Sequence, residues 1–332
     1  MDVPVMTADP LTLRSIYAAR RTIAPFICAT PLRHSATLSA QVGKTVYIKW
    51  ENQQQTGSFK VRGAANRLCN LDEASKQRGV VTVSTGNHGR GVAYVAQQLG
   101  IRAVICVPEL VLPHKVAAMQ QLGAEVIVHG RTQDDAERHA HSLVAAEGLT
   151  LISAFDDPDI ITGQGTVGLE ILEACPQVDT VIAPLSGGGL LGGIALALKS
   201  ADPTVHIIGV SQALGPAMYL SLQAGHPVAV TEEPSLADSL LGGIGLENYH
   251  TLSLIRELVD EIVLLDEAEI ATAMRTAFQQ ERQVLEGGGS VGIGALVAGK
   301  GTLVGEHIVV VASGGNVDLA KLLKLMNDSN GQ

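Results

Sequence analysis

The sequence predicts an α/β protein with mostly parallel sheets. Runs rich in Val and Ile alternate along the chain with segments of helical character, which is typical of βαβ units. Several of these runs end in glycine-rich turns, where open α/β sheets place their ligands. The chain has 332 residues, of which 46% are apolar and 17% charged, so it can bury a large core and is long enough for about two domains.

Nine strands are expected, with helices between most of them. In chain order the strands are residues 46–50, 80–84, 103–107, 125–128, 150–153, 180–184, 206–210, 262–265 and 307–312. Capping residues indicate two of the helices. One lies between Thr132 and Gly148, with Asp135 in its first turn, and a longer one lies between Asp266 and Gly287.

Composition excludes several classes of function. The net charge is −10, no basic run occurs and aromatic residues make up only 3%, so nucleic acid and anionic membrane are poor partners. Residues 180–198 carry no charge, but Pro184 and five glycines favour a strand, a loop and a helix over a membrane span. The four widely spaced cysteines, together with Asp2 and Asp9 in place of an apolar signal segment, favour a reduced, cytoplasmic protein.

A glycine cluster follows the strand at 180–184 and opens a helix. It contains Ser186, Gly187, Gly188, Gly189 and Leu190. Free backbone N–H groups at a helix start bind anions, and glycine lets a phosphate approach closely. The pattern also fits a dinucleotide fingerprint, but the next strand is followed by no acidic residue that could hold a ribose. We therefore favour a monophosphate site, with a tight packing turn as the alternative.

Residues 49–64 contain a lysine in an unusual setting. Thr56 or Ser58 can cap a helix, which would place Lys60 in its first turn. The positive end of the helix dipole disfavours an ammonium there, so the pKa of Lys60 should fall and the free amine needed for a Schiff base should become accessible. A solvated surface lysine is the alternative.

Two further polar turns follow strands. Ser84, Thr85, Gly86, Asn87 and His88 bring hydroxyls, an amide and free N–H groups together, which suits a carboxylate. Residues 312–316 form a similar turn. In isolation, each could equally be a capped turn without a ligand.

Taken together, these segments resemble the threonine/serine dehydratase group of fold-type II pyridoxal-phosphate enzymes, which includes serine racemases. The match runs in order over nearly the whole chain, which makes it far more specific than any single motif. Residues 232–245 and 285–289 most resemble dehydratases of hydroxyectoine utilisation.

The resemblance implies a role for each motif. Lys60 would form the Schiff base, Asn87 would lie beside the ring hydroxyl of pyridoxal 5'-phosphate, and Ser313 would be the partner of the pyridine nitrogen. The implied cofactor-binding residues are Phe59, Lys60, Asn87, Ser186, Gly187, Gly188, Gly189, Leu190 and Ser313. The substrate carboxylate would bind the turn formed by Ser84, Thr85, Gly86, Asn87 and His88.

The fold implied is like that of the tryptophan synthase β-subunit. A large domain would contain residues 1–54 and 148–332, a smaller α/β domain of residues 55–147 would be inserted into it, and the cofactor would lie in the crevice between them. The resemblance also implies a homodimer.

The chain departs from the family at informative positions. Where related enzymes offer carboxylates to a divalent cation, this chain has Ser211 and Pro216, so we expect no metal site there. Racemases place a serine on the cofactor face opposite the lysine, and here that position is Thr85, whose branched side chain is stiffer. Lys60 and Thr85 are therefore the candidate catalytic residues.

The predicted function is elimination of water from a β-hydroxy amino acid, giving a 2-oxo acid and ammonia. Two alternatives stay open within the same cofactor class, an amino-acid racemase and a 3-hydroxyaspartate ammonia-lyase. Two others belong to different classes, a non-catalytic ligand-binding protein and an NAD-linked oxidoreductase. The sequence does not identify the substrate side chain.

Overall fold

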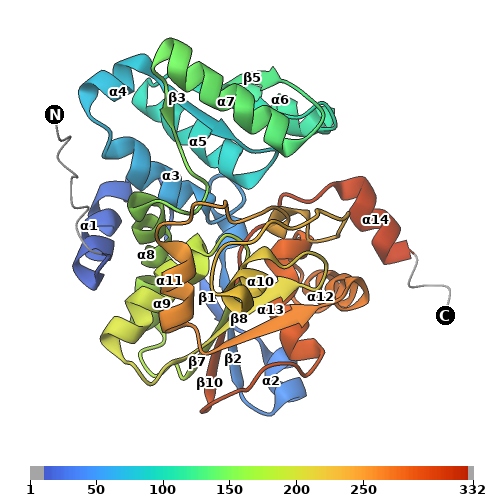
Figure 1. Cartoon of the computed structure of the whole chain (residues 1–332). Helices are drawn as coiled ribbons and strands as arrows, with labels where there is room; N and C mark the ends of the chain where they lie inside the picture. The colour runs from blue at the N-terminus through green and yellow to red at the C-terminus, as the bar shows by residue number, and fades with distance from the viewer. Residues whose placement is uncertain (1–10, 328–332) are drawn as a thin grey trace.

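Two sheets form the framework of the computed structural model, which describes residues 11–327 (Figure 1). The larger sheet has six strands in the order β1-β2-β10-β7-β8-β9, and the smaller has four in the order β5-β4-β3-β6. Neighbouring strands are parallel except β1 and β2, which run antiparallel. The predicted α/β class with mostly parallel sheets is confirmed. Asp2 and Asp9, used above to argue against secretion, lie outside the described residues.

All nine predicted strands are present, and β1 is an additional one. The strands of the larger sheet are β1 (Leu32–His34), β2 (Thr45–Trp50), β10 (His307–Ala312), β7 (Thr180–Pro184), β8 (His206–Gln212) and β9 (Glu261–Leu265). Those of the smaller sheet are β5 (Glu125–Val128), β4 (Ala103–Val107), β3 (Val80–Val83) and β6 (Thr150–Leu151). Every residue of β4 and β7 is buried, as expected for parallel strands covered on both faces.

Helices cover both faces of the larger sheet. One face packs against α2 (Ala36–Val42), α12 (Glu267–Gln279) and α13 (Gly287–Val297), and α14 (Leu319–Asn327) packs on α12. The other face packs against α8 (Pro158–Ala174), α9 (Gly189–Ala201), α10 (Ala217–Ala224) and α11 (Thr251–Leu258), with α1 (Leu13–Ile23) outside α8 and α9. The short helices η1 (Glu51–Gln53) and η2 (Asp238–Leu240) lie near α13 and the end of β10.

The smaller sheet is covered in the same way. Helices α3 (Lys60–Cys69), α5 (Asn87–Leu99) and α6 (Pro113–Gln121) share one apolar core with it, and α7 (Gln133–Glu147) packs on the opposite face. Helix α4 (Glu73–Arg78) leads into β3. Helix α3 also packs against α8, which joins the smaller sheet and its helices to the rest of the molecule.

The capping predictions were right for one helix and half right for the other. Thr132 caps α7 with a reciprocal capping box, and Gly148 ends it in the left-handed conformation. Asp266 caps α12 as expected, but this helix ends at Gln279 and Gly287 instead begins α13. The intervening chain turns at Arg282, whose φ of 58° breaks the helical path.

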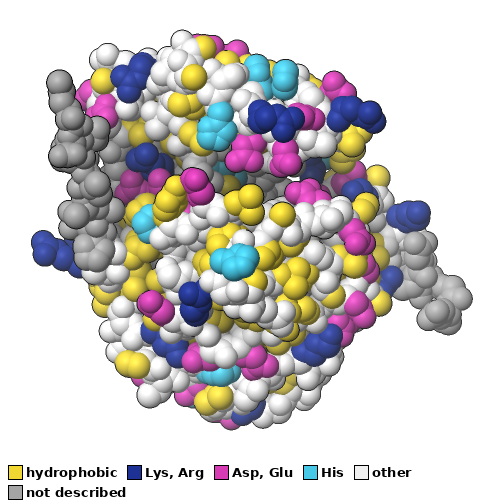
Figure 2. Space-filling view, in the orientation of Figure 1, with side chains coloured by type: hydrophobic (Ala, Val, Ile, Leu, Met, Phe, Trp, Pro, Cys, Tyr) yellow, Lys and Arg dark blue, Asp and Glu magenta, His cyan; other side chains and the backbone are white. Residues whose placement is uncertain are grey.

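Pairing within the smaller sheet bears on the proposed division of the chain. The predicted boundary between residues 147 and 148 falls before β6, yet β6 pairs with β3. We would therefore end the inserted domain after Leu151, and we call residues 55–151 the small unit and the rest of the described chain the large unit. The division into two domains stays a prediction. Figure 2 shows a furrow across the molecule between the two units, with acidic and basic side chains on both rims.

No helix within residues 11–327 is long and apolar enough to cross a membrane, and residues 180–198 fold as β7 and α9.

Candidate active site

Lys60 lies where the two units meet. It is the first residue of α3 and is partly buried, and its Nζ donates a hydrogen bond to the carbonyl oxygen of Ala154 at 2.7 Å. Burial lowers the pKa of Lys60 to about 8, against the opposing effect of the Glu286 carboxylate. The predicted pKa decrease is confirmed in direction, and its principal cause is desolvation.

The capping of α3 differs from the prediction. Phe59 occupies the N-cap position and no side chain caps the helix, so the expected caps from Thr56 or Ser58 are wrong. The chain here is held by the segment after β10 instead. Ser58 forms a β-bridge with Gly314, and the N–H of Phe59 donates to the carbonyl of Ser313 at 3.1 Å. Ser313 is thereby fixed beside the start of the lysine helix.

The turn between β3 and α5 lies close to this segment. Ser84, Thr85 and Gly86 are partly buried, and Asn87 is the first residue of α5. The Asn87 Nδ2 donates to Glu286 Oε1 at 2.5 Å, and its Oδ1 accepts from Asn316 at 2.7 Å. Asn87 thus joins the small unit to two residues of the large one.

His88 has a narrower role than the sequence suggested. Its ring is buried, and Nε2 lies 3.3 Å from the carbonyl oxygen of Ile152. Burial, reinforced by Lys60, lowers the pKa of His88 to about 3, so the ring is neutral at physiological pH. It can offer no positive charge to a substrate carboxylate, and only its backbone N–H at the start of α5 suits that role.

The glycine cluster occupies the turn from β7 into α9. Gly188 adopts a φ of 88°, and α9 begins at Gly189, so the first N–H groups of the helix have no partner within it. A Cβ at Gly187 would lie 2.3 Å from the Phe155 ring, and one at Gly189 would lie 2.9 Å from the Phe155 carbonyl oxygen. Glycine is therefore required by packing, and the same turn presents the N–H groups that an anion needs. Leu190 is buried in the core, and Ser186 is partly exposed.

Residues 154 and 155 connect the lysine with the glycine turn. Ala154 accepts the hydrogen bond from Lys60, and the adjacent Phe155 lies against Gly187 and Gly189. All four motifs therefore meet between the two sheets, near the C-terminal ends of β7 and β10 in the larger sheet and of β3 in the smaller one. Sequence reasoning missed Glu286, Arg90 and the role of Asn316, because none of them stands out without its neighbours.

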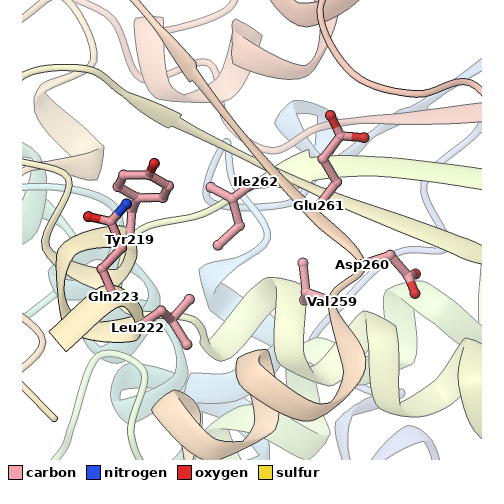
Figure 3. A pocket seen from close by; sticks show the side chains of 7 residues that line it. All are labelled: Tyr219, Leu222, Gln223, Val259, Asp260, Glu261 and Ile262. Atoms are coloured by element: carbon pink, nitrogen blue, oxygen red, sulfur yellow. The ribbon is translucent and has the colours of Figure 1, made fainter. Parts of the chain in front are cut away.

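A separate pocket of about 330 Å³ lies elsewhere (Figure 3). Its walls come from α10 and from the start of β9, the opposite end of the strand from the edge that carries the motifs. The lining residues are Tyr219, Leu222, Gln223, Val259, Asp260, Glu261 and Ile262. The pocket contains no predicted site residue.

Candidate metal ligands do not cluster in the part of the chain that the structure describes, where no group of three or more His, Cys, Asp or Glu side chains could hold an ion. Ser211 lies buried in β8 and Pro216 precedes α10. Independence from metal stays a prediction.

Residues 23–314 match the family model described as "Pyridoxal-phosphate dependent enzyme". The chain belongs to this family. It is 49% identical over 317 residues to a putative threonine dehydratase of Sinorhizobium fredii, with 96% of each chain covered. It is 40% identical to an L-threonine ammonia-lyase of Thermotoga maritima, covering 96% of this chain and 78% of that one.

Solved structures agree with this pyridoxal-phosphate enzyme in fold. Maize serine racemase has a TM-score of 0.90 at 33% identity, covering 97% of this chain and 98% of that one. The processed form of threonine deaminase isoform 2 from Solanum lycopersicum has a TM-score of 0.89 at 36% identity, covering 96% and 87%. The predicted fold-type II class, cofactor and lyase character are confirmed, and the NAD-linked and non-catalytic alternatives are wrong. The hydroxyectoine assignment stays a prediction.

The residues present fit pyridoxal phosphate. The lowered pKa of Lys60, about 8, makes its neutral amine more accessible near physiological pH, and the uncapped start of α9 offers N–H groups to a phosphate. The side-chain oxygens of Thr56 and Ser58, in the segment that precedes Lys60, are buried and have no hydrogen-bond partner within the described residues. Buried hydroxyls without partners are uncommon in proteins, and they are consistent with a polar group binding nearby.

Proposed function

We propose that this enzyme removes water from a β-hydroxy amino acid of the threonine or serine type. Loss of the α-proton and the β-hydroxyl as water gives an enamine, which takes up water and yields a 2-oxo acid and ammonia. The observation that carries the proposal is the partly buried Lys60 amine, held by Ala154 where four motifs meet. The names of the two relatives, threonine dehydratase and L-threonine ammonia-lyase, support the same reaction class.

Each part of the site has a proposed task. When bound, the cofactor supplies an aldehyde for Lys60 and a ring that spreads the charge left by the departing α-proton. Lys60 accepts that proton as a neutral amine. Asn87 would donate to the ring hydroxyl, and Ser313 would offer the ring nitrogen a neutral hydroxyl, so that no carboxylate would hold this nitrogen in its protonated form.

The remaining groups bind the charged ends of the ligands. Ser186 and Gly187 to Leu190 hold the cofactor phosphate through the first turn of α9. The turn from Ser84 to His88 binds the substrate carboxylate, with N–H groups at the start of α5 as donors.

Racemisation is the second candidate, because the maize serine racemase shares this fold at 33% identity. Lys60 would move the α-proton on one face of the substrate, so racemisation would need an acid on the other face. Thr85 is the proposed group there, and its hydroxyl is a weak acid on a stiff side chain. We expect elimination to dominate, with racemisation as a minor side reaction.

The deciding experiment follows both reactions in one assay. Wild type and Thr85→Ala are given L-threonine or L-serine, and oxo-acid yield is measured beside the chirality of the unreacted substrate. We expect Thr85→Ala to keep elimination and lose racemisation. Equal rates of the two reactions in the wild type would make the enzyme a racemase. Parallel loss of both in Thr85→Ala would mean that Thr85 holds the substrate.

The substrate side chain and the assembly are further proposals. Ammonia release from threonine, serine, 3-hydroxyaspartate and hydroxyectoine-derived acids would rank the candidate substrates. A cytoplasmic homodimer is proposed from the resemblance to the family, and sedimentation of the holoenzyme would test the dimer.

A further inference from the structure

We propose that Glu286 is a positioning residue, which acts through Asn87 to fix which end of that amide faces the cofactor ring. The inference rests on the proposed function, because it takes Asn87 to lie beside the ring hydroxyl. Glu286 immediately precedes α13, and its carboxylate contacts Asn87 at the start of α5. The contact therefore spans the two units.

Arg90, Asn316, Asn87 and Glu286 are joined in this order by hydrogen bonds and are called the relay here. The charged residue at each end sets which way the two asparagine amides point. Arg90 can only donate, and its Nη1 donates to Asn316 Oδ1 at 2.9 Å. Asn316 must therefore present its NH₂ group elsewhere, and it donates to the carbonyl of Thr56 at 2.8 Å and to Asn87 Oδ1 at 2.7 Å. The Asn87 NH₂ group is left facing Glu286, where an ionised carboxylate can only accept.

One N–H of the Asn87 amide is held by Glu286, and the other has no hydrogen-bond partner among residues 11–327. A reversed amide would place two oxygens against each other at Glu286 and two NH₂ groups against each other at Asn316. Glu286 and Asn316 together hold Asn87 as a donor, which is the role proposed for it beside the ring hydroxyl.

Two glycines in the predicted motifs make room for the relay. A Cβ at Gly314 would lie 2.6 Å from Glu286 Oε1, and one at Gly57 would lie 2.6 Å from Asn316 Oδ1. Gly57 also has a φ of 76°, a conformation that side chains rarely adopt. Glycine at these two positions therefore leaves the space that the side chains of Glu286 and Asn316 occupy.

The usual role of an acid at the start of a helix does not explain Glu286. It occupies the N-cap of α13 but makes no capping hydrogen bond, and its side chain is buried. Burial and Asp238 raise the pKa of Glu286 to about 7, while Asn87, Ser239 and Lys115 oppose the increase. Lys60 and Arg90 are the other charged groups that interact with it. Protonation below about pH 7 would remove the negative charge and leave a weaker acceptor, so the hold on Asn87 should weaken as the pH falls.

The test compares pyridoxal phosphate with an analogue in which hydrogen replaces the ring hydroxyl. Full-length chains stripped of cofactor are titrated with each compound by isothermal titration calorimetry, and folding is checked by circular dichroism. The variants are Asn87→Ala and Glu286→Gln. The control is Glu267→Gln, which alters a carboxylate that binds Ser235 and the N–H of Leu236 outside the relay.

We expect wild type and Glu267→Gln to bind pyridoxal phosphate about tenfold more tightly than the analogue, the value of one hydrogen bond to a charged group. Asn87→Ala should abolish this preference, and Glu286→Gln should reduce it to about threefold or less. A full preference in Glu286→Gln, with none in Asn87→Ala, would overturn the inference and leave the proposed function intact. A full preference in Asn87→Ala would show that Asn87 is not beside the hydroxyl, and the proposed site and the inference would both fall.

A second measurement needs no variant and covers the case in which Glu286→Gln does not fold. The preference of the wild type should decrease between about pH 8 and about pH 6, as Glu286 takes up its proton. Because both compounds carry the same phosphate, its titration cancels in the ratio. A constant preference over this range would contradict the proposed role of Glu286.

Discussion

Two groups of buried charges lie near the lysine helix, and they differ in how completely they are paired. The first is centred on Arg62, which belongs to the lysine helix itself. Arg62 is fully buried and makes two hydrogen bonds of 2.8 Å to Glu51 and two of 2.6 and 2.9 Å to Glu170. Lys49 also pairs with Glu170. Burial alone would lower the pKa of Arg62, but the two carboxylates raise it above its ordinary value.

The second group faces the crevice and is poorly compensated. None of the ion pairs found within residues 11–327 includes Glu286, and its pKa rises to about 7. Within the same residues Lys60 forms no ion pair either, and its pKa falls to about 8 although the Glu286 charge opposes the decrease. Paired buried charges keep their ionisation and fix the backbone, whereas unpaired ones titrate near neutral pH and can exchange protons. The helix that carries the reactive amine of Lys60 is thus held two residues later by a rigid ionic anchor, the ion pairs of Arg62 with Glu51 and Glu170.

Removing the reactive amine gives the largest expected effect. Lys60→Ala should lower the rate of elimination by about 10³-fold or more, because it removes both the covalent link and the base. The covalent link is mapped by borohydride reduction of the wild type and peptide analysis. A label on Lys44, Lys49 or Lys115 would contradict the assignment.

Breaking the anchor should affect stability. Arg62→Met leaves Glu51 and Glu170 buried without their main partner, so the free energy of unfolding should fall by about 3–5 kcal/mol. The control is Arg20→Met, which removes an exposed pair with Glu173 and should cost about 1 kcal/mol or less. Urea denaturation monitors both variants. Equal losses of unfolding free energy in the two variants would show that the buried ion pairs stabilise the fold no more than an exposed pair does.

A charge placed in the glycine turn should weaken cofactor binding. Gly188→Asp puts a carboxylate against the phosphate and a Cβ 2.9 Å from Met218, so affinity should fall at least about tenfold. Gly225→Asp introduces the same side chain at a similar φ of 80° with nothing within 4 Å, and it should bind normally. If the two variants bound the cofactor equally well, the glycine turn would serve packing alone.

The smallest effect concerns the pH dependence of the amine. Only neutral Lys60 can attack the cofactor aldehyde, so the rate of capture should rise about fivefold between about pH 7 and about pH 8 and level off above its pKa of about 8. Stopped-flow absorbance measures this rate. A midpoint near the ordinary lysine value of 10.5 would show that burial leaves the amine unperturbed.

Much of the fold could be predicted because buried parallel strands are recognisable in sequence. The unpredicted strand β1 has only three residues, of which Arg33 and His34 are exposed, and it exists through its pairing with β2. The end of α12 at Gln279 was also not predicted. No glycine or proline lies between Gln279 and Gly287 to mark the end of the helix, and a positive φ at a residue such as Arg282 is not signalled by the sequence.

The site was predictable to the extent that its parts follow strands. Lys60, Asn87, Ser313 and the glycine turn each come directly after a strand or at a helix start, and parallel strands bring such turns to one edge. Glu286 gave no such signal, because an acidic residue before a helix is normally a cap. Its role depends on contacts with residues about 200 positions away, which only the folded chain brings together.

The place of β10 has a consequence for how the chain is made. The strands of the smaller sheet all lie between residues 80 and 151, so this sheet can be completed early in synthesis. β10 is the last strand of the chain, yet it lies between β2 and β7 and pairs with both. Until it leaves the ribosome, two apolar strands present open edges that favour aggregation. Chains that stop short of residue 307 should therefore be the ones that depend most on chaperones.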